Sequence, residues 1–549
     1  MKTDLALVQC PGWGRECPPH ALACLSAYAR REGFSVVGFD LNNEFYLRSA
    51  SYRKMWDDKD YYSFWENRSR VCELIASNEP LISRFVEDIL RSGAPVVGFS
   101  THTTSFLISL ELARRIKARA HERIVLFGGP QCSRAQAGRS FAEEACVDAV
   151  VVGEGETTLV DVLAGVRRGE DLVPRPGLIM RYRDQIVDGG DRPLLENMDA
   201  LPIPDYSDFA ENMRGGRYNA PERLDIFDSR GCVRTCHFCS EWQFWRKFRT
   251  MSGERMFAEV SEQVRCHPHV RHFYFIGSLL NGNIRVLERF CDLILASNLK
   301  ITWEGQAIVH AKMDDAMLRK MHAAGCRWLG FGIESGSERL RRAMNKNFTN
   351  DAAFKTLRAA KAAGIKAQIN IMFGLPTETR EDFEETKRLL VRVRPHVDSV
   401  LASQSFTVLD KGTEPQVRPE NFGITGQEHH LYWTSNGGEN NYAERFRRYE
   451  EFCRLALELG FPEESGVLRR KPDKWQLLGE YFEHERDYVR ALLCLRRSVL
   501  RESRNTTILR RLSDCYLKAG RPDKAAWYLR EAEALKPQGA RSDKEAVGA

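Results

Sequence analysis

Short apolar runs alternate with longer amphipathic stretches along the first third of the chain. A run at residues 5–8 leads through a Pro/Gly-rich loop into a helical pattern at 20–31, which stops at Gly33 before a second run at 35–39. This rhythm is typical of parallel strands joined by crossover helices, and it predicts a doubly wound, Rossmann-like α/β sheet. Further strands are predicted at residues 95–100, 123–127 and 147–152, with a helix at 106–118.

Each predicted strand of this sheet ends in small or polar residues. Ligands bind at the carboxyl ends of the strands in open α/β sheets, and paired glycines let a backbone approach a ligand. Tight turns would explain any one of these ends, but four on one edge favour a ligand site. No G-x-G-x-x-G follows the first strand, so a nicotinamide cofactor is not indicated. The candidate cofactor contacts are Ser100, Thr101, Gly128, Gly129 and Glu154.

A second series of strand–helix units follows a Pro-rich linker at residues 191–222. Six such units predict an open, partial (β/α)6 barrel of the TIM type over residues 223–410. Its functional groups should lie at the C-terminal ends of the strands. The predicted strands are residues 224–228, 272–276, 300–306, 328–333, 367–373 and 399–406.

Three cysteines, Cys232, Cys236 and Cys239, directly follow the first of these strands with the spacing C-x3-C-x2-C. Three thiolates are an odd number for disulfides and one short of a closed zinc site. They suit a [4Fe-4S] cluster with one iron left open, because a closed cluster uses four thiolates. An open iron can bind a small molecule, so the loop is a candidate reaction centre.

Composition narrows the classes of protein further. The formal net charge of the 549 residues is only +6, without a basic tail, so nucleic acid is not a required partner. No apolar run reaches the length of a membrane span, and the first residues lack the pattern of a signal peptide. Most of the 15 cysteines are scattered singly, as in a reducing compartment. We expect a cytoplasmic protein.

Aromatic and basic residues alternate just after the cysteines, at residues 242–249. Such a pattern occurs in proteins that bind single-stranded nucleic acid. The favoured interpretation is an amphipathic segment that packs against the N-terminal domain.

A period of 34 residues appears near the end of the chain. Leu478 pairs with Leu512, and Ala491 pairs with Ala525. Residues 471–537 therefore resemble two tetratricopeptide repeats, which would form α-helical hairpins. They are either a C-terminal helical cap or a groove for a protein partner. A helical extension is expected at 411–470, and a disordered tail at 538–549.

The N-terminal strings are similar to those of a known cofactor-binding domain. Pro18-Pro19, the Gly128-Gly129-Pro130 turn and the Gly153-Glu154-Gly155-Glu156 string resemble the cobalamin-binding domain of B12-dependent radical SAM enzymes. The resemblance covers about residues 1–190 and implies cobalamin as a cofactor. This region lacks the string Asp-x-His-x-x-Gly, whose His would ligate cobalt from below in the wider B12-binding group. That departure implies cobalamin bound without a protein imidazole, or a domain that has lost the cofactor.

The central domain resembles the radical SAM superfamily. Besides the cysteine loop, the strings at residues 332–337 and 374–379 fall at the spacing of that family. The resemblance implies that the three thiolates hold the cluster and that its fourth iron binds S-adenosylmethionine (SAM). It also implies a 5′-deoxyadenosyl radical as the reactive species. The implied SAM contacts are Glu334 for the ribose, Gly277 and Ser278 for the amino group, Phe238 beside the adenine, and Gln306.

The two resemblances together imply a cobalamin-dependent radical SAM enzyme that methylates an unactivated carbon. Its substrate would be a small molecule, a lipid or a peptide, and an external donor would supply electrons. No residue is assigned as a catalytic acid, base or nucleophile.

Three alternatives remain open. In the first, the enzyme carries out cyclisation or rearrangement without methyl transfer. In the second, the chain is a non-catalytic scaffold built around its repeats. A methylthiotransferase is disfavoured because Cys10, Cys17 and Cys24, at seven-residue spacing, do not resemble the second cysteine triad of that family.

Overall fold

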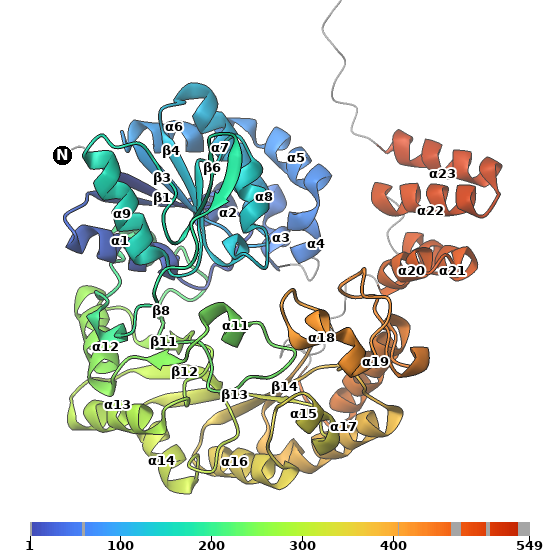
Figure 1. The fold of residues 1–549 in the computed structure, drawn as a ribbon. Helices are drawn as coiled ribbons and strands as arrows, with labels where there is room; N and C mark the ends of the chain where they lie inside the picture. The colour runs from blue at the N-terminus through green and yellow to red at the C-terminus, as the bar shows by residue number, and fades with distance from the viewer. Residues whose placement is uncertain (1–2, 58–60, 404–405, 463–473, 501–504, 536–549) are drawn as a thin grey trace, which may run out of the picture.

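The computed structural model describes residues 3–57, 61–403, 406–462, 474–500 and 505–535. Figure 1 shows two α/β domains stacked one above the other, with helices from the end of the chain at one side. The predicted disordered tail lies outside the described residues.

The N-terminal domain is a seven-stranded sheet in the order β2-β1-β3-β4-β5-β6-β7. Its first five strands are parallel, which confirms the doubly wound prediction, and β6 and β7 add an antiparallel hairpin that was not predicted. Because β1 lies between β2 and β3, the order of the strands reverses there. The strands are β1 (Leu5–Gln9), β2 (Val36–Asp40), β3 (Val96–Ser100), β4 (Ile124–Gly128), β5 (Ala149–Val151), β6 (Leu178–Tyr182) and β7 (Gln185–Asp188).

Helices cover both faces of this sheet. One face packs on α1 and α9, and the other packs on a larger group that includes the five helices between β2 and β3. Those five helices were not predicted. The helices are α1 (His20–Arg31), α2 (Leu41–Arg48), α3 (Lys54–Asp57), α4 (Tyr61–Glu66), α5 (Arg68–Ser77), α6 (Glu79–Arg91), α7 (Phe106–Arg119), α8 (Gly138–Glu143) and α9 (Gly155–Arg167).

The central domain is a six-stranded parallel sheet whose strands follow one another in chain order. This arrangement confirms the open partial barrel, with β8 and β15 as its two edges. The strands are β8 (Arg223–Ile226), β11 (His272–Phe275), β12 (Thr302–Ala307), β13 (Cys326–Glu334), β14 (Lys366–Ile371) and β15 (Ser399–Ala402). The helices are α12 (Gly253–Cys266), α13 (Ile284–Ala296), α14 (Asp315–Ala323), α15 (Glu338–Ala343), α16 (Asn350–Ala362) and α17 (Arg380–Val393).

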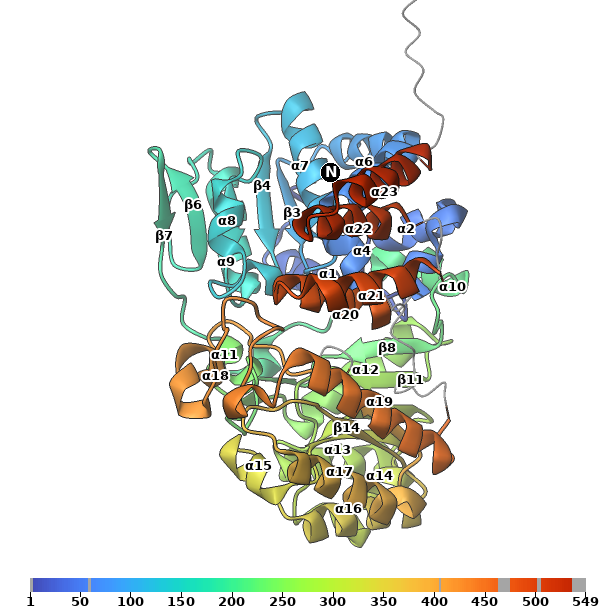
Figure 2. The same cartoon turned by 90° about the vertical axis from the view of Figure 1, so that its right-hand side faces the viewer.

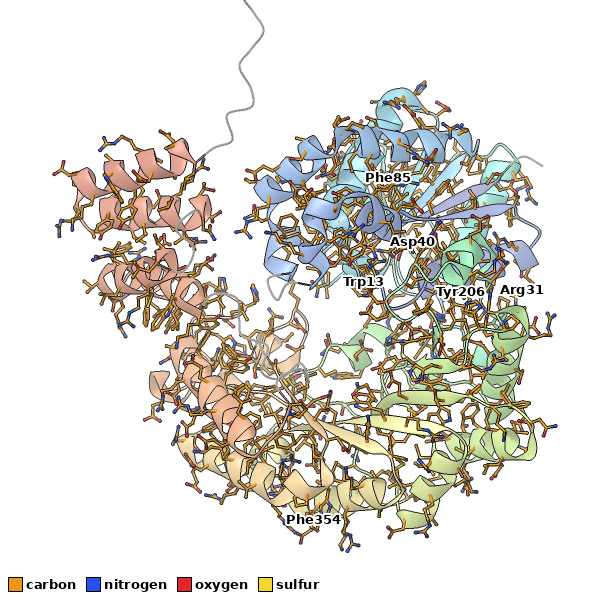
Figure 3. The ribbon with its side chains drawn as sticks, turned by 180° about the vertical axis from the view of Figure 1, so that it is seen from behind. Trp13, Arg31, Asp40, Phe85, Tyr206 and Phe354 are labelled. Atoms are coloured by element: carbon orange, nitrogen blue, oxygen red, sulfur yellow. The ribbon has the colours of Figure 1, made fainter. Side chains whose placement is uncertain are left out.

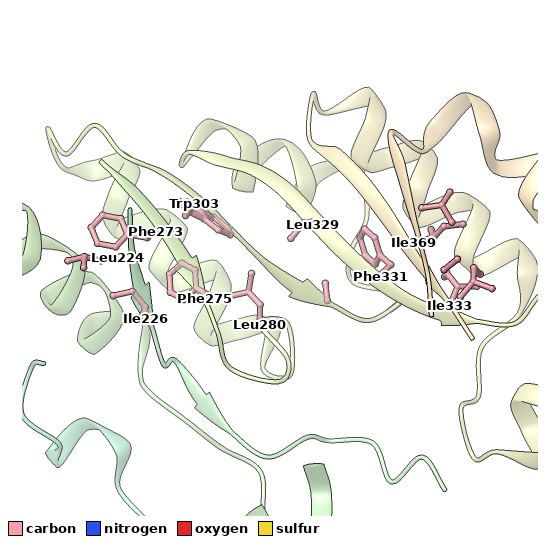
Figure 4. Packing of buried hydrophobic residues seen from close by; sticks show 14 of the residues in the cluster. Leu224, Ile226, Phe273, Phe275, Leu280, Trp303, Leu329, Phe331, Ile333 and Ile369 are labelled. Atoms are coloured by element: carbon pink, nitrogen blue, oxygen red, sulfur yellow. The ribbon is translucent and has the colours of Figure 1, made fainter. Parts of the chain in front are cut away.

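The barrel strands separate apolar from polar side chains by the period of two that a strand imposes. The outward positions are buried under the helices, as Figure 4 shows for Phe273, Phe275, Trp303 and Phe331. The inward positions are largely polar and only half-buried. The apolar layer therefore lies between sheet and helices, and the lumen is left for polar groups.

The segment predicted as a linker packs onto the N-terminal domain. Tyr206 and Phe209 are buried, and Asp205 and Asp208 form ion pairs with Arg30 at 2.5 and 2.8 Å. The segment contains one short α-helix, α10 (Ala210–Arg214), and two 3-10 helices, η3 (Met198–Ala200) and η4 (Ser207–Phe209).

Helices follow the barrel at the end of the chain. The extension contains α18 (Glu414–Val417) and α19 (Tyr442–Glu458), and α19 packs on α17 and β15. Two helical hairpins stack beyond α19, on the side of the molecule that Figure 2 turns toward the viewer. Their helices are α20 (Lys474–His484), α21 (Tyr488–Val499), α22 (Thr506–Lys518) and α23 (Pro522–Ala534). Among the residues that the structure describes, none of the helices is long and apolar enough to cross a membrane.

We predict that Trp303→Ala strongly destabilises the barrel. The indole is fully buried, packs edge-on against Phe275 and Phe290, and donates a hydrogen bond to Ala324 O at 2.8 Å. Removal of a buried aromatic side chain costs about 3–5 kcal/mol. Urea denaturation followed by fluorescence should show this loss, whereas Leu295→Ala, at a 47 % exposed residue, should change stability by less than about 0.5 kcal/mol. Equal effects of the two substitutions would contradict the packing described.

Candidate functional site

A cavity of about 480 Å³ lies where the carboxyl edge of the N-terminal sheet meets the barrel. Its floor is made by the loops that follow β1, β3, β4 and β5, and its roof includes Phe227, Phe244 and Trp245. Figure 3 places Trp13, Asp40 and Tyr206 at this level, between the two domains. A cavity of this size, largely apolar and with a few polar groups, is typical of a cofactor site.

Four of the five candidate contacts on the N-terminal sheet line this cavity, namely Ser100, Gly128, Gly129 and Glu154. Gly129 has a φ of 100°, and a Cβ there would lie 2.7 Å from Thr101 O, so the turn requires glycine. Thr101 is the exception. It is fully buried, and its hydroxyl donates to Gly128 O at 2.8 Å, so it supports the turn and does not face the cavity.

Two histidines line the cavity, and sequence reasoning assigned no role to either. His20 is held on both sides, with Nδ1 2.7 Å from Tyr206 Oη and Nε2 3.1 Å from Cys24 Sγ. The ring of His102 stacks on Trp13, with 3.6 Å between centroids. Burial lowers the pKa of each imidazole to about 4, so both are neutral at pH 7.

The three cysteines lie on a loop that is closed at its base by a two-stranded ladder, β9 (Ser229–Arg230) with β10 (Arg249–Thr250). Gly231 starts the loop with a φ of 82°, and a Cβ there would lie 2.7 Å from Lys247 O. Burial raises the pKa of Cys239 to about 12 and also raises that of Cys236. These thiols therefore ionise when a cation such as iron stabilises the thiolate.

Hydrogen bonds attach the cysteine loop to the segment after β13. His237 N donates to Met344 O at 3.0 Å, and its Nδ1 lies 3.1 Å from Ala343 O. Asn345 Nδ2 donates to Thr235 O at 3.0 Å. Within the described residues, no three His, Cys, Asp or Glu side chains converge closely enough to hold a single metal ion. A four-iron cluster spreads its thiolates over separate irons, so the three cysteines still suit it.

Glu334 lies at the end of β13 with a φ of 64°, an uncommon conformation for a residue with a side chain. Its Oε1 lies 2.8 Å from Nζ of Lys346, a residue that carried no signal in the sequence. Burial alone would lower the pKa of Lys346, but Glu334 together with Cys236 and Cys239 raises it. The Lys346 ammonium also lies 5.8 Å from the ring centroid of Phe238, which brings Phe238 into the same group.

The other SAM candidates lie at the ends of neighbouring strands. Gly277 N donates to Asp228 Oδ1 at 3.2 Å, and the Ser278 hydroxyl donates to Glu241. Gln306 faces the lumen, where its amide bonds Tyr274 Oη at 3.2 Å and accepts from Asn370 at 3.3 Å. Gln306 and Asn370 thus belong to one chain of hydrogen bonds across the inner face of the sheet.

Comparison with known proteins agrees with this geometry. Residues 226–390 match the model of the radical SAM superfamily, and residues 67–163 match that of the B12 binding domain. The chain carries a B12-binding domain and a radical SAM enzyme domain. These domains imply a [4Fe-4S] cluster, SAM and cobalamin as cofactors, and the cysteine loop and the interdomain cavity fit them.

Several curated proteins are similar over part of their length. An uncharacterized methyltransferase of Pyrococcus horikoshii is 28% identical over 56% of this chain and 66% of its own length. An anaerobic magnesium-protoporphyrin IX monomethyl ester cyclase of Cereibacter sphaeroides is 27% identical over 51% and 47%. The hopanoid C-3 methylase of Methylococcus capsulatus is 22% identical over 59% and 60%. The matches thus span less than two thirds of each of these relatives.

Two solved structures share the fold. The radical SAM methyltransferase TsrM of Kitasatospora setae, with cobalamin and a [4Fe-4S] cluster bound, gives a TM-score of 0.59 at 16% identity over 82% of this chain and 85% of that one. The cobalamin-dependent radical SAM enzyme OxsB gives 0.60 at 16% identity over 99% and 82%. The arrangement of both domains is therefore one that such enzymes adopt.

A buried group of charges joins the B12-binding domain to the base of the cysteine loop. Arg230 pairs with Glu156 and lies 2.9 Å from Glu154, and Arg249 lies 2.6 Å from Glu154. All four side chains are less than 10 % exposed. Burial opposes the ionisation of Glu154, but Arg230, the Leu195 N–H and Arg249 outweigh it and lower the pKa of that carboxyl. We call this group, Glu154, Glu156, Arg230 and Arg249, the interdomain clasp.

The basic residues after the cysteines form ion pairs with the segment predicted as a linker. Arg246 pairs with Asp191, and Lys247 Nζ lies 2.5 Å from Glu196. Their charges are thus met by carboxylates of this protein.

We predict that Glu154→Gln destabilises the protein by about 3–5 kcal/mol, because it leaves two buried arginines without their shared charge. Because the pKa of Glu154 is lowered in the folded protein, its carboxylate stabilises the fold fully at pH values above the ordinary glutamate pKa. This stabilisation is lost as pH falls from that value through the lowered pKa. Denaturation of both proteins at pH 7 and near pH 4 should show a difference that shrinks with acid. The control Glu170→Gln removes an exposed partner of Arg168 and should have little effect at either pH.

Proposed function

We propose that the chain is a cobalamin-dependent radical SAM methyltransferase that acts on an unactivated carbon of a small molecule, lipid or peptide. The observation that carries the proposal is the position of the cavity. It is shared between the sheet edge of the B12-binding domain and the residues around the cysteine loop, including Phe227, Arg230 and Trp245. A methyl carrier and a radical source must both reach one substrate carbon, and this arrangement supports that requirement.

Different residues of the chain would hold the cluster and SAM. When bound, the cluster supplies an electron for SAM cleavage and cobalamin supplies a carrier for the methyl group. Cys232, Cys236 and Cys239 would hold three irons as thiolates, with electrons from an external donor. Glu334 would accept hydrogen bonds from the SAM ribose, and Phe238 would lie beside the adenine. Gly277 and Ser278 would meet the amino group through their backbone.

Lys346 supplies a positive charge that the sequence motifs do not reveal. Its ammonium lies 2.8 Å from Glu334, and the Cys236 and Cys239 thiols contribute to the raised pKa of Lys346. We propose that it orients the Glu334 carboxylate and partly neutralises the thiolates.

A radical intermediate must be kept away from water, and aromatic side chains line the cavity on the side of the barrel. Phe227 packs against Trp245, which in turn packs edge-on against Phe244, with centroids 5.5 and 4.8 Å apart. These three rings and Trp13 line the cavity and would shield the reacting carbon.

Cyclisation is the second candidate reaction. The magnesium-protoporphyrin ester cyclases among the similar proteins carry that name, and they match about half of this chain. Cyclisation would use the same radical site without transfer of a methyl group.

The helical hairpins support the proposal of two tetratricopeptide-like repeats. Leu512 is fully buried, as is Ala491. A Cβ on Gly479 would lie 2.7 Å from Leu495, and the Ser513 hydroxyl, 34 positions further on, bonds Ala525 O at 2.8 Å. Small residues at equivalent positions let each helix pair approach closely, as in tetratricopeptide repeats.

We predict that anaerobic incubation with SAM, cobalamin and a reductant yields 5′-deoxyadenosine and S-adenosylhomocysteine together. Cys236→Ala should lose cluster iron and the formation of 5′-deoxyadenosine, whereas Cys72→Ala, at an exposed cysteine on α5, should keep the iron content. Chromatography of the nucleosides and an iron assay measure these outcomes. 5′-Deoxyadenosine alone would favour cyclisation. Full product formation by the Cys236→Ala variant would overturn the role of the cysteine loop, and absence of both products with the unaltered, iron-loaded protein would favour a scaffold.

We also predict that Lys346→Met raises the KM for SAM about tenfold or more, because it leaves Glu334 without its cation. Lys346→Arg should restore part of the affinity, since it returns the charge. Lys355→Met, on the outer helix α16, is the control and should behave like the unaltered protein. An unchanged KM for Lys346→Met would show that the pair does not serve SAM binding.

A further inference from the structure

Four large apolar side chains of the helical hairpins project into solvent. Val489, Leu493 and Leu500 of α21 are 72, 55 and 85 % exposed, and Trp527 of α23 is 49 % exposed. Apolar residues scattered singly over a surface need no explanation, whereas several on one face mark an interaction site. Figure 2 shows the hairpins at the outside of the molecule, beyond α19.

Helix geometry places three of these side chains on one stripe. Residues 489, 493, 496 and 500 are separated by four, three and four positions, so they follow one another along α21. The opposite side of α21, which includes Ala491 and Leu495, is buried. Trp527 lies 34 residues after Leu493, at the equivalent position of the second hairpin. We call Val489, Leu493, Arg496, Arg497, Leu500 and Trp527 the outer face of the hairpins.

The charge of the outer face is positive. α21 carries three arginines and no carboxylate. Within the described residues, Arg496 has no ion-pair partner, and the Arg497 guanidinium lies 4.5 Å from the ring centroid of Trp475. Where the hairpins face the extension the charges are instead neutralised, as Lys518 is by Glu483 at 2.9 Å. The outer face therefore keeps two positive charges beside its apolar side chains.

This combination of side chains fits the surface of a bilayer that contains anionic lipids. Amphipathic helices that lie in the plane of a bilayer present leucine and tryptophan to the acyl chains and arginine to the headgroups. Anionic headgroups attract exposed basic residues. The segment after α23 is a poor cover for the outer face, because residues 536–549 contain one valine and no leucine, isoleucine or aromatic residue.

We propose that the outer face docks the protein reversibly on an anionic membrane surface. α21 would lie along the surface, with Leu493, Leu500 and Trp527 at the level of the headgroups and Arg496 and Arg497 against lipid phosphates. Such docking requires no membrane-spanning helix. It goes beyond the proposed function, and it would place the enzyme beside lipid, one of the three proposed classes of substrate.

The test is co-flotation of the full-length, cofactor-loaded protein with vesicles on a density gradient, without SAM or reductant. Vesicles of phosphatidylcholine alone are compared with vesicles that also contain phosphatidylglycerol. We expect binding to the anionic vesicles to be about tenfold tighter or more, and to weaken as salt screens the arginines. This comparison requires no substitution. Absence of binding to the anionic vesicles would overturn the proposal and favour a protein partner for this face.

Variants assign the binding to the outer face. The double variant Leu493→Ser with Leu500→Ser should bind anionic vesicles about tenfold more weakly or less, because it removes apolar area. The double variant Arg496→Gln with Arg497→Gln should lose a similar factor, because it removes the attraction to phosphate. These four side chains are exposed, so the variants should fold.

Matched controls change the same residue types on the barrel. Leu295→Ser and Arg285→Gln alter an exposed leucine and an exposed arginine of α13, and both should bind vesicles like the unaltered protein. Vesicle binding by either double variant that equals that of the controls would overturn docking through the outer face. Because the assay contains no SAM or reductant, its result is independent of whether the proposed radical function holds.

Discussion

The interdomain clasp is the contact on which the arrangement of the site depends. Arg230 and Arg249 lie opposite each other in the ladder that closes the cysteine loop, and Glu154 lies in the loop after β5. A buried ionic group contributes little net stability, because desolvation of the charges offsets most of their attraction. What it does supply is specificity of position: a shift of either domain would leave a buried charge without a partner. The edge of the B12-binding domain and the cysteine loop are thereby held at one cavity.

The radical SAM domain combines a stable barrel with a polar interior. Its outward side chains, such as Trp303 and Phe331, form the apolar layer under the helices. Its inward positions carry amides and charges, among them Gln306 and Asn370, that bond to one another. Because stability comes from the outer layer, the lumen is free to bind a polar cofactor. The same division explains why the functional strings lie at strand ends, where side chains leave the packed layer.

Much of the fold could be predicted from local patterns of apolar and polar residues in the sequence. Strands of both domains were predicted within a few residues. Those of the N-terminal sheet are short apolar runs, such as Leu5–Gln9, and those of the barrel alternate apolar and polar residues, as in Thr302–Ala307. The cysteine loop was singled out by its spacing and Glu334 by the resemblance to radical SAM enzymes, and both stay predictions. The helices between β2 and β3 and the hairpin of β6 with β7 were missed. Helices α3 and α4 are too short to show a clear period, whereas α6, with Ile82, Phe85 and Ile89 on one face, does carry the pattern of an amphipathic helix and was overlooked. The hairpin turns at Arg183-Asp184, which lacks the glycine that usually marks such a turn. Thr101 was misassigned, because a strand-end residue can face either the ligand or the turn beneath it.

Local spacing along the chain was enough to predict three thiols on one loop, six parallel strand–helix units and a 34-residue repeat. Pairings between distant residues were not accessible in this way. Lys346 meets Glu334 from the far end of α15, Arg230 meets Glu154 across a domain boundary, and Trp13 meets His102 only because β1 and β3 are neighbours in the sheet. The physical reason is the range of the interactions. Periodicity and turn chemistry act over a few residues, whereas a desolvated charge or a stacked ring acquires its partner only when packing brings distant segments together.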